Sequence, residues 1–177
     1  MTKKNINLKE LAKFLVRAKT NTYASLKSKE IKSERPNHKE LEFEDGDFYY
    51  RDSYVGFFQA PGMEEVRLGK EGKIIWTMAY SGGMLPEFHG DLELAKSAFT
   101  FLKEALSLVS EEMPYRGPKK LKREDWEYFN SVNGDIKRFS GNEKIFFKRK
   151  EVFSQEYIGG LVIEKWQTKI KKWLMKK

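Results

Sequence analysis

One segment of the chain occurs twice, and this repetition restricts the possible folds more than any other feature of the sequence. Residues 47–83 read DFYYRDSYVGFFQAPGMEEVRLGKEGKIIWTMAYSGG, and residues 125–160 read DWEYFNSVNGDIKRFSGNEKIFFKRKEVFSQEYIGG. The alignment shifts by a residue or two only where turns are expected. Two similar segments predict two similar local structures. The identical pairs include Asp47 with Asp125, Tyr50 with Tyr128, Ser53 with Ser131, Gly56 with Gly134, Gly62 with Gly141, Glu64 with Glu143, and Tyr80 with Tyr157.

Each copy follows a stretch with helical periodicity. Apolar residues recur at three- and four-residue steps in residues 7–20 and again in residues 91–110, with Asn7 and Asp91 as suitable N-caps. Alternating apolar positions and turn residues within each copy indicate three or four antiparallel strands. We therefore expect an α+β fold made of internally duplicated helix-plus-three/four-strand units, related by a pseudo-twofold axis.

The predicted organisation is a single domain over residues 1–177. One half covers about 7–83 and the other about 91–160, because either half alone would bury too little surface to be stable. An extra basic amphipathic helix is predicted for residues 161–177, with apolar residues on one side and lysines on the other.

The basic charge is concentrated at the end of the sequence. The formal net charge is +8, and residues 164–177 contain six lysines against one glutamate. The predicted last helix therefore has three interpretations. It packs on the sheet, it forms a partner or homodimer contact through its tryptophans, or it contacts nucleic acid or an anionic membrane.

The composition excludes several classes of site. There are no cysteines, so the chain has no disulfide framework, thiolate metal site or cysteine nucleophile. The only histidines, His38 and His89, fall in predicted loops without a carboxylate at ligand spacing, so we predict no metal site and no cofactor. No phosphate-binding or hydrolase motif is present. No membrane span or signal peptide is predicted, and we expect a cytoplasmic protein.

The best candidate site lies on the aromatic strand of the first copy. Asp52 shares a strand face with Tyr50 and Tyr54, and Trp76 and Tyr80 are expected to face it from another strand. A carboxylate among aromatic rings suits a cationic or hydrogen-bonding ligand, or a base with a raised pKa. The alternative is a structural hydrogen-bond network. Arg116 is a candidate for an anion contact.

The two copies differ at the centre of this candidate site. Asn130 stands in the second copy where Asp52 stands in the first. A site that depends on a negative charge is therefore expected in the first copy alone.

Several runs resemble one uncharacterised bacterial family, a domain of unknown function. They include LEFEDGDFYYRDSYVG, IIWTMAYSG, FLKEAL and EEMPYRGP, and the resemblance extends over roughly residues 10–160. The resemblance implies a domain that occurs alone or C-terminal to an XRE-type helix-turn-helix, where regulators place a sensor or interaction module. This sequence departs from that arrangement by lacking the DNA-binding domain and by adding a basic segment after Gly160.

The function that we expect is a non-catalytic ligand-sensing module that binds an unidentified small molecule. The alternatives are a homodimeric interaction module that uses the last helix, and salt-dependent nucleic-acid binding through the lysine-rich termini. An enzyme is the least favoured class, because no set of residues identifies a reaction.

Overall fold

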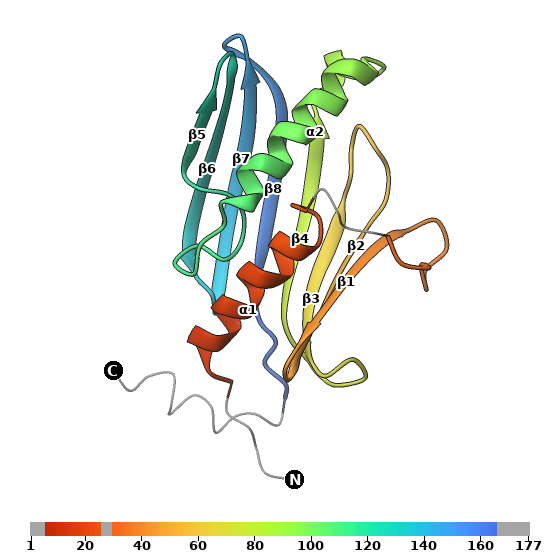
Figure 1. The fold of residues 1–177 in the computed structure, drawn as a ribbon, viewed down its shortest axis with the longest axis vertical. Helices are drawn as coiled ribbons and strands as arrows, with labels where there is room; N and C mark the ends of the chain where they lie inside the picture. Colours follow the sequence, from red (N-terminus) through yellow and green to blue (C-terminus); the bar gives the residue numbers. More distant parts are fainter. Residues whose placement is uncertain (1–5, 26–29, 166–177) are drawn as a thin grey trace.

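The computed structural model describes residues 6–25 and 30–165, which form two α-helices and one eight-stranded antiparallel sheet (Figure 1). The strands lie in the order β1-β2-β3-β4-β8-β7-β6-β5. The elements are α1 (Leu8–Asn21), β1 (Lys39–Asp45), β2 (Phe48–Tyr54), β3 (Gly62–Leu68), β4 (Ile74–Met84), the 3-10 turn η1 (Pro86–Phe88), α2 (Leu92–Ser107), β5 (Lys120–Arg123), β6 (Trp126–Asp135), β7 (Arg138–Phe147) and β8 (Lys150–Leu161).

Both helices begin at the caps that the sequence predicts. The Asn7 side chain accepts hydrogen bonds from the backbone N–H groups of Lys9 and Glu10, at 3.0 and 3.4 Å. The Asp91 side chain accepts one from Leu94 N–H at 3.0 Å. Each cap satisfies backbone donors that the first turn of a helix leaves without a partner.

The predicted fold class is wrong. We expected duplicated helix-plus-strand units, but the structure is dominated by a single sheet with only two helices in the described part of the chain. The reason is the pairing of β4 with β8, which runs from Trp76 opposite Leu161 to Met84 opposite Phe153. This pairing joins all eight strands edge to edge. Local periodicity predicts where strands occur but does not predict which edges pair.

The predicted helix over 161–177 is wrong at its start. Leu161 is the last residue of β8, and its N–H donates to Lys137 O at 3.0 Å. Val162 N–H continues the extended pairing by donating to Ile75 O at 2.9 Å. Residues 166–177 lie outside the described residues.

The two helices cover the same face of the sheet (Figure 1). Leu11, Phe14 and Leu15 of α1 are fully buried against β2, β3 and β4, while Ala98 and Ala105 of α2 are fully buried above β6, β7 and β8. Burial of each large apolar side chain contributes roughly 1.5–3 kcal/mol. The helices therefore create two neighbouring apolar clusters on one face, and a polar layer lies between them.

The opposite face of the sheet is more polar. The described residues there form an open groove of about 640 Å³ over the central strands, with Ser81, Ser131, Asn142, Glu156 and Ile158 on its surface. No helix in the described part of the chain is both long and apolar enough to cross a membrane.

Candidate functional site

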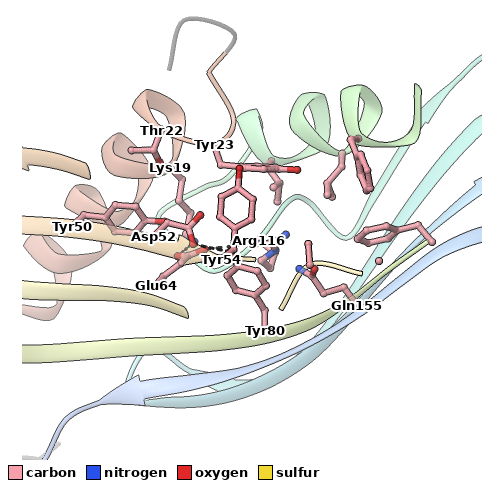
Figure 2. A pocket seen from close by; sticks show the side chains of 16 residues that line it. Lys19, Thr22, Tyr23, Tyr50, Asp52, Tyr54, Glu64, Tyr80, Arg116 and Gln155 are labelled. Atoms are coloured by element: carbon pink, nitrogen blue, oxygen red, sulfur yellow. Dashed lines mark hydrogen bonds and ion pairs between the residues drawn. The ribbon is translucent and has the colours of Figure 1, made fainter. Parts of the chain in front are cut away.

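A small cavity of about 50 Å³ lies where the two apolar clusters meet, beneath the end of α1 and beside α2 (Figure 2). Apolar residues of α2 and β8 close one side of the cavity. The other side is polar and aromatic, and its residues are Lys19, Thr22, Tyr23, Tyr50, Asp52, Tyr54, Glu64, Tyr80, Arg116 and Gln155. The cavity lies over β2, β3, β4 and β8, so residues far apart in the sequence meet there.

Five of the six residues selected from the sequence line this cavity. They are Tyr50, Asp52, Tyr54, Tyr80 and Arg116. That they bind a ligand stays a prediction.

The sixth selected residue, Trp76, lies elsewhere. It shares a face of β4 with Tyr80 but is four residues away, which is roughly 13 Å along a strand. Its ring stacks on Phe139 with centroids 5.7 Å apart, and its Nε1–H donates to Ile136 O at 3.2 Å. The side chain is fully buried. Trp76 is therefore part of the apolar core beneath α1.

The Tyr80 ring reaches Asp52 across an intervening strand. Gly62 of β3 is the register partner of Tyr80, and β3 separates β4 from the β2 strand that carries Asp52. A Cβ atom on Gly62 would collide with the Tyr80 hydroxyl and lie 2.7 Å from the Tyr54 Cβ. Because Gly62 has no side chain, the Tyr80 ring lies over it and its hydroxyl donates to Asp52 Oδ1 at 2.7 Å.

Two buried ion pairs cross the floor of the cavity. Lys19 Nζ of α1 donates to Glu64 Oε2 of β3. Arg116, in the loop after α2, donates to Glu143 Oε1 from Nε at 2.9 Å and from Nη2 at 2.5 Å. Arg116 Nη1 also lies 3.6 Å from Glu64 Oε1. Each of these glutamates therefore has a cation beside it.

The polar layer between the two apolar clusters consists of Asp52, Arg116 and three further charged residues. Sequence reasoning did not select these three residues, which are Lys19, Glu64 and Glu143. Lys19 follows Leu15 by four residues and therefore lies on the apolar face of α1, an unusual position for a lysine without a partner. Glu64 and Glu143 are aligned in the two copies at inward-facing strand positions. Charged residues on a predicted core face were the signal that could have identified the layer.

Asp52 is the carboxyl group of this layer that has no cation partner. It is 3% exposed, and none of the ion pairs among residues 6–25 and 30–165 includes it. Burial raises the pKa of Asp52 to about 7, and the nearby Glu64 carboxylate adds to the increase. The Tyr80 hydroxyl, Lys19 and Arg116 oppose it. Burial and the neighbouring Asp52 raise the pKa of Tyr80, which keeps its hydroxyl a hydrogen-bond donor.

The corresponding position in the second copy is neutral. Asn130 of β6 accepts a hydrogen bond from the Tyr157 hydroxyl at 2.7 Å, the same length as the bond from Tyr80 to Asp52. Its Nδ2 group donates to Gly117 O at 2.8 Å. The hydrogen bond from Tyr157 to Asn130 shows that an amide can accept a tyrosine hydrogen bond at such a position.

The chemistry available to the cavity is hydrogen bonding, cation binding and proton exchange near neutral pH. No group of three or more histidine or carboxylate side chains in the described residues is arranged to hold a metal ion. The rings of His38 and His89 each lie 3.0 Å from a backbone carbonyl oxygen, those of Pro36 and Met84, respectively.

Comparison with known proteins identifies a family without an assigned function. Residues 52–162 match the model of a family described as a domain of unknown function, DUF5680. This range begins at Asp52 and includes Glu64, Tyr80, Arg116 and Glu143. No curated protein and no solved structure matches the chain. Because the family model covers well over half of the sequence, the chain belongs to the DUF5680 family.

Proposed function

We propose that this protein is a non-catalytic small-molecule-binding module of the ligand-sensing type, and that its ligand occupies the cavity around Asp52. The observation that supports the proposal most strongly is the state of Asp52. A buried carboxyl group with one tyrosine donor and no cation is costly to keep ionised in a fold. Because Asp52 lines the wall of a cavity, a bound ligand could interact with this carboxyl group.

The composition of the cavity wall also supports a binding role. Small-molecule sites are typically concave and aromatic, with a few converging polar groups. Here Tyr23, Tyr50, Tyr54 and Tyr80 surround Asp52. The polar groups come from elements on both sides of the cavity, so a bound ligand would contact both helix regions and the sheet.

A sensor role in the cytoplasm agrees with the resemblance to a bacterial family whose members also occur behind an XRE-type helix-turn-helix. In such an arrangement the ligand-binding domain transmits occupancy to a second domain. For this chain we propose the binding step, and we propose that occupancy alters the packing of α1, which carries Lys19.

The test is a thermal-shift screen of metabolites against the native protein and two variants. Asp52→Asn removes the buried charge and keeps an oxygen that Tyr80 can donate to. Glu156→Gln makes the same chemical change at an exposed residue of β8 on the opposite face, and serves as the control. A ligand of the cavity raises the melting temperature of the native protein and of Glu156→Gln by mass action, but not that of Asp52→Asn. Compounds that stabilise all three proteins equally would refute the proposed site.

Two other proposals from the sequence depend on the ends of the chain, the homodimer on the last basic segment and nucleic-acid binding on the lysine-rich termini. A homodimer through residues 161–177 predicts that deletion of residues 166–177 converts a dimer to a monomer in light scattering. Nucleic-acid binding predicts an affinity that falls steeply as the salt concentration rises. The residues that carry both proposals lie mostly outside the described residues, so the cavity is the better-supported site.

A further inference from the structure

We propose that the ligand of the cavity is a small organic cation of the primary-ammonium or guanidinium class, held by the carboxylate of Asp52. This inference rests on the proposed function and specifies its ligand. The buried charges, the aromatic wall and the size of the cavity each support it.

The buried charges of the polar layer favour a cation. The layer contains three carboxyl groups, those of Asp52, Glu64 and Glu143, and two basic groups, those of Lys19 and Arg116. The two basic groups are already paired with the two glutamates. A monovalent cation bound at Asp52 would bring the polar layer to three positive and three negative charges. An anion would instead have to compete with Glu64 and Glu143 for Lys19 and Arg116.

The aromatic wall also suits a cation. The face of a tyrosine ring attracts a positive charge within about 6 Å of its centroid. Arg116 already uses this interaction, since its guanidinium carbon lies 5.5 Å from the centroid of the Tyr80 ring. The Tyr23 and Tyr54 rings meet edge to face 6.1 Å apart above Asp52, and both are only partly buried (Figure 2). A ligand would reach the carboxyl group by passing between these two rings.

The volume limits the ligand to a few atoms. A cavity of about 50 Å³ has room for roughly three to five water-sized groups, because each occupies about 10–15 Å³ on this scale. Methylammonium, ethylammonium and guanidinium have two to four non-hydrogen atoms (roughly the same range) and fit this limit. A longer amine would need its chain to extend between Tyr23 and Tyr54.

Binding of a cation should depend on pH because only ionised Asp52 attracts it. The titratable and charged groups that face Asp52 from the surrounding elements are Lys19 of α1, Tyr23 after α1, Tyr50 and Tyr54 of β2 itself, Glu64 of β3, Tyr80 of β4 and Arg116 of the loop after α2. With burial raising the pKa of Asp52 to about 7, the ionised fraction increases about tenfold between pH 6 and pH 8. The apparent affinity should increase by the same factor, and protons should be released on binding near pH 7.

The test is isothermal titration calorimetry with methylammonium, ethylammonium and guanidinium as probes. Ethanol, urea and acetate serve as neutral and anionic counterparts of similar size. We expect at least one cationic probe to bind about tenfold more tightly at pH 8 than at pH 6. Its binding should weaken at least tenfold in Asp52→Asn and remain unchanged in Glu156→Gln. Titrations in two buffers with different ionisation enthalpies measure the released protons on the native protein alone, which keeps the test valid if Asp52→Asn folds poorly.

The outcomes separate this inference from the proposed function. If ethanol, urea, acetate or a neutral or anionic metabolite binds in an Asp52-dependent manner while no cationic probe does, the ligand class is wrong and the binding site stands. Cation binding without proton release or pH dependence would also overturn the inference. If no probe and no metabolite depends on Asp52, both the inference and the proposed function fail.

Discussion

Replacement of Asp52 by asparagine should make the protein more stable at neutral pH, and the gain should grow as the pH rises. The pKa of Asp52 is raised from its ordinary value of 3.8 to about 7, chiefly by burial. The folded state therefore holds a proton more tightly than the unfolded state between these two values. Stability is lost as the pH rises through this window, because the unfolded chain releases the proton first.

The magnitude follows from the size of the shift. Each pKa unit corresponds to about 1.4 kcal/mol, so the full difference is about 4 kcal/mol above pH 7. Between pH 5 and pH 8, about two units of the window are crossed, which gives a loss of about 3 kcal/mol. The asparagine side chain of the variant does not titrate. Tyr80 can donate to its amide oxygen, as Tyr157 donates to Asn130 at 2.7 Å.

Urea denaturation of the native protein and of Asp52→Asn at pH 5, 6, 7 and 8 measures this difference directly. Titrating groups that do not interact with Asp52 are common to both proteins and cancel when the two free energies of unfolding are subtracted. We expect the variant to gain about 3 kcal/mol relative to the native protein over this range. A difference that stays constant from pH 5 to pH 8 would refute the reasoning, because it would mean that Asp52 does not titrate in this window.

Three further substitutions test the geometry around the cavity. Gly62→Ala places a methyl group against the Tyr80 ring, so we expect a loss of about 1–3 kcal/mol in denaturation. In that background the pH-dependent gain from Asp52→Asn should be larger, because the Tyr80 hydrogen bond that lowers the pKa of Asp52 is lost; an unaffected stability would contradict the ring position. Lys19→Met leaves Glu64 buried without its main partner and should cost about 3–5 kcal/mol, much of it recovered in the double variant with Glu64→Gln; equal losses in both would argue against a pair. Trp76→Phe should lower stability by about 1–3 kcal/mol through lost packing and the lost indole hydrogen bond, without changing ligand affinity; an altered affinity would place the residue nearer the cavity than the structure does.

The local elements of the fold could be predicted from the sequence, but the sheet could not. The caps Asn7 and Asp91 and the hydrophobic periodicity located α1 and α2, because these signals act within a few residues. The pairing of β4 with β8 joins segments about eighty residues apart and has no local signal. The end of β8 shows the same limitation. Residues after Gly160 have helical periodicity, yet Leu161 and Val162 continue the pairing with residues near Lys137 and Ile75.

The candidate site was predicted in part for a similar reason. Alternation along β2 placed Tyr50, Asp52 and Tyr54 on one face, and this holds because a strand fixes side-chain direction over short distances. Trp76 lies away from the cavity, because a shared strand face does not specify distance along the strand. The partners of Asp52 also depend on how α1 and the loop after α2 cross the sheet. No sequence pattern indicates that Lys19 ends above β3.

The difference between Asp52 and Asn130 is the strongest structural argument for a binding role. Both positions accept a hydrogen bond of 2.7 Å from a tyrosine that extends across a glycine of the neighbouring strand. Packing therefore does not require a charge, since Asn130 satisfies the same geometry with a neutral amide. At Asp52 the charge instead lowers stability by up to about 4 kcal/mol at neutral pH. A residue that destabilises its fold where a neutral residue would suffice is typical of functional sites. A cation that binds ionised Asp52 would offset this loss, so the same carboxyl group would link occupancy of the cavity to the stability of the fold around it.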